Sequence, residues 1–416
     1  MTQLDSTFTR RQFPAFDSPV LSAGAFFENA GGSYPCRQVV ERLTRFYTDR
    51  KVQPYAPYDA SRLAGEEMDE ARTRLAALMG VLAEEVSFGP STSANTYVLA
   101  QALRRLIAEK GGAVVVTDQD HEANSGVWRR LAEDGVEVRE WRIDPTTGHL
   151  DPEDLRALLA DGRVRLVAFP HCSNVVAEIN PVAGICAMAR EAKALTCVDG
   201  VSYAPHGLPD IPALGADIYM FSAYKTYGPH QGIMVIRREA GEALPNQGHF
   251  FNAGALYKRF TPAGPDHAQV AACAGIADSV DALHAHHFPG SGVPGSEAGP
   301  LARNRAVHDL MRAQEVALLQ PLLDYLSDRN DLRLIGSRDA TSRAPTVALV
   351  HDRPGEALAA DLAPHGIMAG GGDFYAVRPL RAMGVDPDHG VLRLSFVHYT
   401  TKAEVDRLIA ALERVL

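Results

Sequence analysis

The chain has 416 residues, of which 46% are hydrophobic and 22% are charged, an ordinary globular composition whose length indicates two to three domains. Its formal net charge of −10 argues against nucleic acid as a partner, because phosphate binding needs a basic face. No apolar run reaches the roughly 18–20 residues of a membrane span, so no membrane association is expected.

Other terminal and compositional signals point to the cytoplasm. The N-terminus, MTQLDSTFTRRQFPAF, lacks the apolar core of a signal peptide. The cysteines are scattered without paired spacing, which predicts reduced thiols rather than a disulfide framework or a zinc site: Cys36, Cys172, Cys186, Cys197 and Cys273.

The N-terminal part begins with an uninformative stretch, residues 1–25. A strand end at Phe26-Phe27 then meets a tight glycine turn, Glu28-Asn29-Ala30-Gly31-Gly32, which by itself is an ordinary loop. Helices are expected over residues 37–50 and 64–79, because apolar residues recur there at helical spacing.

Two strand–turn–helix units follow. The first has a strand at 86–88, the turn Gly89–Ser93 and a helix over 94–108. Its free N–H groups and hydroxyls suit a phosphate, although Ser and Thr are also common helix caps. The second has a strand at 114–117, the polar run Asp118–Asn124 and a helix through Trp128. Its lone His121 is either a satisfied polar residue or a proton shuttle.

Further short apolar runs predict strands at 136–143, 164–169, 195–198, 218–221 and 232–236. Helices are expected at 151–159 and from the residues after Asn180-Pro181 to Ala194. This alternation predicts a mostly parallel sheet with helices on both faces. Asn174, Asp199 and Lys225 follow strands, so they should meet the turns carrying Ser91 and His121 beyond the carboxyl ends.

The pair Asp199 and Lys225 suggests a particular chemistry. A lysine amine can form a Schiff base with an aldehyde cofactor. A carboxylate can keep the pyridine nitrogen of pyridoxal phosphate (PLP) protonated, which makes that ring an electron sink. A nicotinamide-type dinucleotide fold is excluded, since no G-x-G-x-x-G follows a strand.

The C-terminal part indicates a smaller α+β domain. The aromatic and basic segment 250–260 is either a packed loop or a segment at a dimer interface that reaches the partner's site. His284-Ala285-His286-His287 is interpreted as a helix end rather than a metal site, and a Gly/Pro/Ser linker follows at 289–300. A long helix from Leu301, strands at 332–335, 346–350, 366–369 and 392–397, and a terminal helix at 402–416 are expected. Arg393 lies in an apolar strand and needs an anion there.

The segments VDG (198–200) and SAYKTYG (222–228) together resemble the cofactor-lysine region of the class V aminotransferases. This PLP family includes cysteine desulfurases, selenocysteine lyases and kynureninases, and the likeness extends from about Phe26 to the C-terminus. It implies an α/β, aspartate aminotransferase-like (fold type I) homodimer. Its expected parts are residues 1–25 packing on the small domain, a large PLP domain at 26–290 and a small α+β domain at 291–416.

The resemblance also assigns roles to individual residues. His121 would stack on the PLP ring, Asn174 would bind its ring hydroxyl, and Arg393 would hold the substrate's α-carboxylate. The implied catalytic residues are Lys225, His121 and Asp199. The implied cofactor-binding residues are Ser91, Thr92, His121, Asn174, Asp199, Ser202, Ser222, Tyr224, Lys225 and, toward the other subunit's phosphate, His267. The implied substrate-binding residues are Asn29, Ala30, Gly31, Arg393 and Tyr375; no metal is expected.

One departure bears on the reaction. Cysteine desulfurases use a nucleophilic cysteine on a loop that matches Gly366–Leu380, yet Tyr375 stands about where it would be and no cysteine follows Cys273. The pattern resembles the cysteine desulfurase-like branch, so we expect β-elimination from an amino acid without a persulfide. An aminotransferase, an epimerase and a non-catalytic PLP-binding protein are the alternatives, and the substrate and the roles of Asp373 and Tyr375 are left open.

Overall fold

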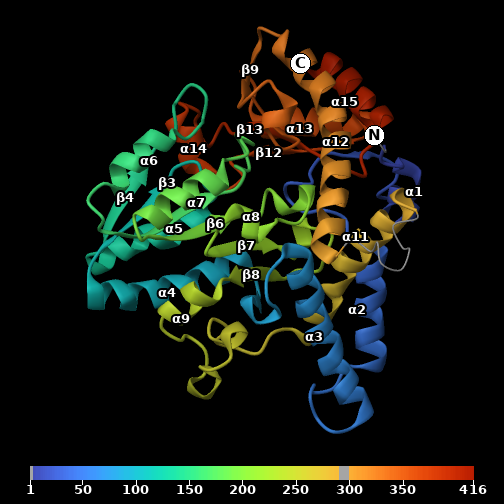
Figure 1. Cartoon of the computed structure of the whole chain (residues 1–416). Helices are drawn as coiled ribbons and strands as arrows, with labels where there is room; N and C mark the ends of the chain where they lie inside the picture. The colour runs from blue at the N-terminus through green and yellow to red at the C-terminus, as the bar shows by residue number, and fades with distance from the viewer. Residues whose placement is uncertain (1–2, 290–298) are drawn as a thin grey trace.

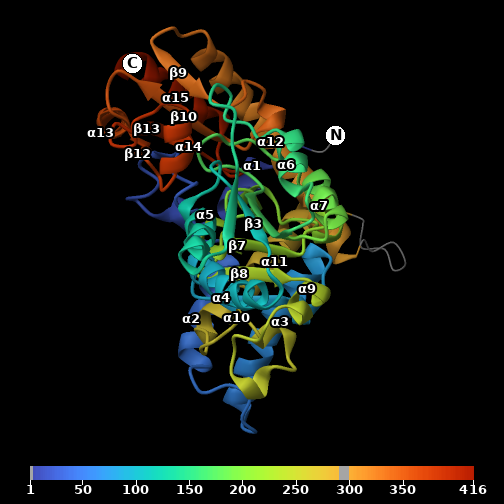
Figure 2. The ribbon, with the colours of Figure 1, turned by 90° about the vertical axis from the view of Figure 1, so that its left-hand side faces the viewer.

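The computed structural model describes residues 3–289 and 299–416; most of the predicted linker at 289–300 lies outside this part. A central sheet occupies the middle of the molecule, and the C-terminal elements gather at one end of it (Figures 1 and 2). No helix in these ranges is long and apolar enough to cross a membrane.

The central sheet has seven strands in the order β2-β8-β7-β6-β5-β3-β4. All pairs from β7 through β4 are parallel, and only β8 runs against its neighbours. This confirms the predicted mostly parallel sheet. The strands are β2 (Val86–Gly89), β3 (Ala113–Thr117), β4 (Glu137–Trp141), β5 (Val164–Pro170), β6 (Leu195–Asp199), β7 (Ile218–Ser222) and β8 (Gly232–Ile236).

Helices cover both faces of this sheet. Successive residues of a strand point to opposite faces, so the apolar side chains of each strand need a covering layer on both sides. Val114 and Val116 face a core shared with α4 and α5, whereas Val115 faces a larger core shared with α3, α7 and α11. The helices of this part are α2 (Arg37–Asp49), α3 (Asp59–Met79), α4 (Thr92–Lys110), α5 (Glu122–Arg129), α6 (Pro152–Leu159), α7 (Val182–Glu191), α8 (Ile211–Leu214), α9 (Arg238–Ala243), α10 (His267–Ala272) and α11 (Ala274–His287).

Two predicted helix boundaries were wrong. Helix α3 begins at Asp59 instead of Ala64, because its first turn is polar and lacks the apolar stripe on which the prediction relied. Helix α7 ends at Glu191 instead of Ala194, since Lys193 adopts a left-handed backbone conformation that ends the helix.

The C-terminal elements form a four-stranded antiparallel sheet, β12-β13-β10-β9, backed by helices. The expected strand at 366–369 is shorter than predicted, because only β11 lies within it and pairs with β1, whereas the glycine run that follows forms the separate strand β12 and pairs with β13. The elements are β1 (Ala25–Phe26), α12 (Pro300–Ser327), β9 (Leu332–Ile335), β10 (Thr346–His351), α13 (Gly355–Leu362), β11 (Ile367–Met368), β12 (Gly370–Gly372), α14 (Val377–Ala382), β13 (Val391–Ser395) and α15 (Lys402–Val415).

The N-terminal segment contacts elements of both parts of the chain. Its helix α1 (Ser6–Arg11) follows Asp5, which pairs with His286 at the end of α11. Arg10 pairs with Glu404 in α15 at 2.8 Å. The predicted packing of residues 1–25 on the small domain, and the predicted domain boundaries, stay predictions.

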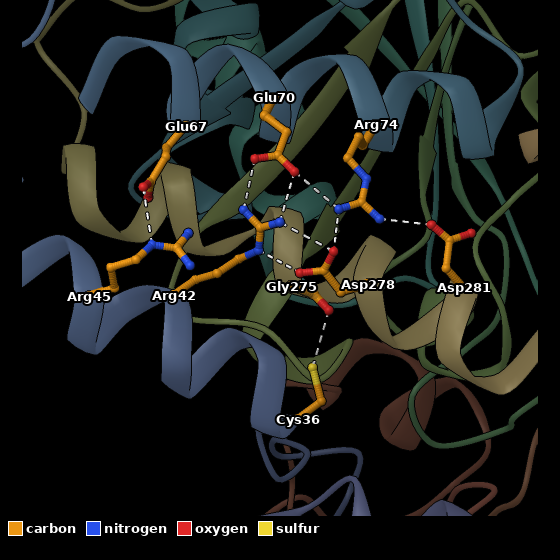
Figure 3. Close-up of polar contacts among 9 residues, drawn as sticks. All are labelled: Cys36, Arg42, Arg45, Glu67, Glu70, Arg74, Gly275, Asp278 and Asp281. Atoms are coloured by element: carbon orange, nitrogen blue, oxygen red, sulfur yellow. Dashed lines mark hydrogen bonds and ion pairs between the residues drawn. The ribbon is translucent and has the colours of Figure 1, made fainter. Parts of the chain in front are cut away.

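A network of ion pairs ties α2, α3 and α11 together (Figure 3). Arg42 of α2 binds Glu70 of α3 at 2.8 Å and Asp278 of α11 at 2.5 Å. Arg74 of α3 binds Asp278 as well, and Asp281 at 2.8 Å. Arg42 links α2 to both α3 and α11, and Arg74 links α3 to α11, so the network fixes how the three helices cross.

The crossing also depends on Gly275 of α11. A methyl group at this position would lie 2.5 Å from the backbone nitrogen of Val39 in α2, so only glycine permits this approach. Cys36, at the start of α2, donates its thiol to the Gly275 carbonyl at 3.5 Å.

We therefore expect Gly275→Ala to lower the free energy of unfolding by about 1–3 kcal/mol, as other overpacking changes do. The matched control is Gly184→Ala in α7, where a methyl group would meet nothing within 4 Å. That change should be neutral or stabilise by up to about 1 kcal/mol, because alanine favours helix. Chemical denaturation of both variants measures the difference, and equal midpoints would contradict the steric argument.

Candidate active site

The carboxyl ends of the parallel strands surround a cavity of about 240 Å³. Nine of the ten predicted cofactor residues line it, which matches the rule that ligands bind beyond this edge of an α/β sheet. The full lining is Ser91, Thr92, Ser93, Asp120, His121, Ala123, Cys172, Asn174, Asp199, Val201, Ser202, Ser222, Tyr224, Lys225 and His230.

Lys225 and Asp199 are the charged pair at the base of the cavity. Lys225 ends the short turn after β7, and burial, together with Arg393, lowers its pKa to about 8 although Asp199 opposes the shift. Asp199 ends β6 and accepts the N–H of Val201 at 2.8 Å. Burial raises the pKa of Asp199 to about 6 against the effects of that N–H and of Lys225. A protonated ring nitrogen would satisfy this buried carboxylate.

An anion cradle forms where α4 begins. Ser91 caps the helix by accepting the N–H of Ala94 at 3.1 Å, and the hydroxyls of Thr92 and Ser222 lie 2.9 Å apart. Gly232 of β8 allows the approach, because a methyl group there would lie 2.4 Å from the carbonyl carbon of Ser91. Hydroxyls at the N-terminus of a long helix fit the phosphate of PLP.

His121 caps α5 and is held neutral. Its Nδ1 accepts the N–H of Ala123 at 3.0 Å, which leaves the proton on Nε2. Burial, together with the charges of Lys225 and Arg393, lowers the pKa of His121 to about 3. A neutral imidazole on the cavity wall is compatible with stacking on a ring, the role that the resemblance implied.

Asn174 joins the cavity to the C-terminal part of the chain. Its Nδ2 donates to the carbonyl of Phe374 at 2.9 Å, whereas its Oδ1 is buried and has no hydrogen-bond partner among the described residues. A buried amide oxygen without a partner is costly, so a ligand hydroxyl would complete this site.

Asp120 is a site residue that sequence reasoning missed. It accepts the backbone N–H of His121 and the Nδ2 of Asn124, each within 2.8 Å, and it lines the cavity. Burial, together with Asp199, raises the pKa of Asp120 well above its usual range. The signal was its place shortly after β3 ends at Thr117, because residues that follow the parallel strands meet at the same sheet edge.

Arg393 lies in β13 and is already paired. Its Nη2 donates to Glu28 Oε1 at 2.9 Å, and the Phe374 ring covers its guanidinium at 3.7 Å. Burial lowers the pKa of Arg393, and Glu28 opposes that shift. Glu28 and Phe374 were both missed by sequence reasoning, and binding of the substrate's carboxylate by Arg393 stays a prediction.

The glycine turn at residues 29–31 is held against β13. Asn29 donates its amide to the Ser395 carbonyl at 3.2 Å and accepts the hydroxyl of Tyr399. The N–H of Ala30 donates to the Ser395 hydroxyl at 2.8 Å, and that of Gly31 to the Glu28 carbonyl. These polar groups are occupied and do not line the cavity, so their contact with substrate stays a prediction.

A loop from the C-terminal part contacts His121 and Asn174, two residues that line the cavity. Phe374 and Tyr375 both have left-handed backbone angles, φ 53° and 56°, which is a strained turn for side chains of this size. The Tyr375 ring lies 5.6 Å from that of His121, and its carbonyl accepts the N–H of Glu122. Arg378 pairs with Glu122 at 2.9 Å, which anchors the loop.

The cysteines and His267 lie away from the reacting groups, with one exception. All five thiols are buried, and only Cys172 lines the cavity. Burial raises the pKa of Cys172 to about 12, and its thiol donates to the Ala177 carbonyl at 3.3 Å, as expected of a packed residue. His267 begins α10 outside the cavity lining, and its contact with a partner subunit's phosphate stays a prediction.

The parallel sheet, the buried lysine–aspartate pair and the anion cradle together define a PLP-dependent enzyme of fold type I. The family model of the class V aminotransferases matches residues 25–261 and 301–408. The chain belongs to the class V aminotransferase family, and its cofactor is PLP.

Known proteins similar to this chain carry two kinds of name. The aminotransferase-like protein FGM3 of Gibberella zeae is 32% identical over 98% of this chain and 97% of its own. A cysteine desulfurase of Yersinia pseudotuberculosis is 29% identical over 94% of this chain and 93% of its own. The apo structure of a Thermococcus onnurineus cysteine desulfurase shares the fold, with a TM-score of 0.83 and 22% identity over 100% of this chain and 98% of that one.

The lowered pKa of Lys225 predicts how capture of PLP by the apoprotein depends on pH. The neutral amine is the reactive form, and with a pKa of about 8 half of it is neutral at pH 8. At the ordinary lysine pKa only about 0.4% would be neutral. The rate should therefore rise with pH and level off above about pH 8.

Stopped-flow absorbance after mixing apoprotein with PLP measures this rate. The Lys225→Ala variant should bind PLP without the visible band of the lysine-linked cofactor. A rate that continues to rise toward pH 10 would show that burial does not lower the pKa of Lys225.

Proposed function

We propose that this protein is a PLP-dependent lyase that eliminates a substituent from Cβ of an amino acid, by breaking a C–S or other Cβ–X bond without a cysteine persulfide. One observation carries the proposal. Nine of the residues predicted to bind PLP line one cavity, and the loop beside His121 carries Tyr375 at about the position that the resemblance assigned to the desulfurase cysteine.

The chain's own residues account for the steps. Bound PLP draws electrons from Cα of the substrate. Asp199 would hold the ring nitrogen of PLP protonated, and Lys225, whose amine has a pKa lowered by burial, would take the proton from Cα. The electron pair then leaves with the Cβ substituent, and the released 2-aminoacrylate reacts with water to give a keto acid and ammonia.

Cys172 does not offer a persulfide route. Burial raises the pKa of its thiol to about 12, so almost none of it is thiolate at neutral pH. Transamination is the second candidate function, supported by the name of the Gibberella zeae relative.

The proposal includes a homodimer in the cytoplasm. Phe250 and Phe251 are 87% and 71% exposed on the segment that was expected at a dimer interface. Large exposed aromatic side chains favour burial against a partner. His267 would then face the partner's phosphate site.

The reaction is tested with β-chloro-L-alanine, O-acetyl-L-serine and L-cysteine. Elimination gives keto acid and ammonia in equal amounts without an added 2-oxo acid, and Lys225→Ala should lower this rate by about 10²–10⁴-fold. Turnover that requires a 2-oxo acid as the amino-group acceptor would contradict the lyase proposal and show that the protein is an aminotransferase.

The mass of the intact protein after turnover with L-cysteine separates the two sulfur routes. No sulfur should be added to any of the five cysteines, since all are buried. A persulfide on Cys172 would contradict the proposed route, even if keto acid were formed.

A further inference from the structure

The guanidinium of Arg393 is neutralised within the chain. Glu28 accepts from its Nη2 at 2.9 Å, and the Arg393 side chain is only 4% exposed. Phe374 covers one face, and Nη1 lies 3.5 Å from the Asn174 carbonyl. The two-N–H fork that binds a carboxylate therefore has one of its arms occupied.

The backbone around Glu28 leaves space for this carboxylate. A methyl group at Gly370 would lie 2.1 Å from Glu28 Oε2, and one at Gly31 would lie 3.0 Å from Oε1. Glu28 bridges Ser395 in parallel register, two residues along β13 from Arg393. Glu28 and Arg393 therefore lie on neighbouring backbone segments, and two glycines leave room for the Glu28 carboxylate. The ion pair is a packed contact, not a loose one at the surface.

A free amino acid would bring a second carboxylate to the same guanidinium. Two carboxylates at one buried cation repel each other, and the one that loses its partner stays partly buried. A carbonyl oxygen carries no charge and needs a single N–H, which Nη1 can donate while Glu28 keeps Nη2. The site therefore suits a neutral acyl group better than a carboxylate.

The space around the site agrees with a longer substrate. The cavity of about 240 Å³ is smaller than the roughly 300–1,000 Å³ of common ligand pockets, and PLP occupies part of it. A groove of about 810 Å³ lies just outside, and Asp373 and Tyr375, the neighbours of Phe374, line it. A group attached to the substrate's carboxyl would pass Phe374 into this groove.

We propose that Glu28 makes the site specific for aminoacyl substrates whose carboxyl group is held in a neutral linkage, as an amide, an ester or a thioester. The inference rests on the amino-acid chemistry proposed above and names its substrate class. Arg393 then orients an acyl oxygen, and the groove holds the attached group.

Binding of unreactive ligands to the holoenzyme tests the proposal. L-alanine, L-alaninamide and L-alanine methyl ester carry no leaving group on Cβ, so titration calorimetry gives a Kd without elimination. The amide or the ester should bind at least about tenfold more tightly than L-alanine, a difference of about 1.4 kcal/mol. Tighter binding of the amide would indicate a peptide-like substrate, and tighter binding of the ester an ester or thioester.

A substitution of Glu28 tests whether this residue causes the preference for uncharged derivatives over L-alanine. Glu28→Gln keeps the size and removes the charge, so L-alanine should bind about tenfold more tightly while L-alaninamide changes little. The control is Glu356→Gln, an exposed glutamate at the start of α13, which should leave both affinities unchanged.

Wild-type protein that binds L-alanine as tightly as both derivatives would overturn the proposal, even if Glu28→Gln failed to fold. Failure of the proposed reaction is separate, because β-chloro-L-alanine and its amide would then both release no ammonia while the order of Kd values stayed the same.

Discussion

The site depends on the parallel pairing of β6 with β7. That pairing sets Asp199 opposite Met220 and carries Lys225 just past the same sheet edge. Both groups are buried, and burial disfavours each charge, so the pKa of the acid rises to about 6 and that of the amine falls to about 8. The lysine becomes reactive near neutral pH, and the carboxylate gains a strong preference for a cationic ring nitrogen.

The second constraint is the way the C-terminal elements close over this edge. Strand β13 supplies Arg393, and the loop after β12 supplies Phe374 and Tyr375. Asn174 donates to the Phe374 carbonyl, so a cofactor-site residue and the loop hold each other in place. The strained turn is tolerated because these contacts and the Glu122–Arg378 pair fix it on both sides.

Local pattern was enough to predict the sheet and most of the cavity lining, because buried strands and the residues that end them are local features. Asp199, Lys225 and Asn174 were found this way. Glu28 was not, since its partner Arg393 is 365 residues away and no local pattern pairs them. Phe374 was missed because its contact with Arg393 needs a left-handed backbone, which sequence does not predict for phenylalanine. The shortening of the strand expected at 366–369, and the separate strand β12 after it, likewise depend on distant partner strands.

The part of the site that faces the cofactor and the part that faces the substrate differ in their charge balance. Toward the cofactor, Asp199 and Lys225 suit any chemistry that needs a protonated ring nitrogen and an amine, and burial together with Asp199 raises the pKa of the neighbouring Asp120. Toward the substrate, Glu28 cancels Arg393. The cofactor half thus suits the general chemistry of the family, whereas the discrimination among substrates that we propose would fall to Glu28, Phe374 and the loop that carries Tyr375. A chain can keep the lysine region of a desulfurase and still act on a different substrate, because the selective contacts come from other strands.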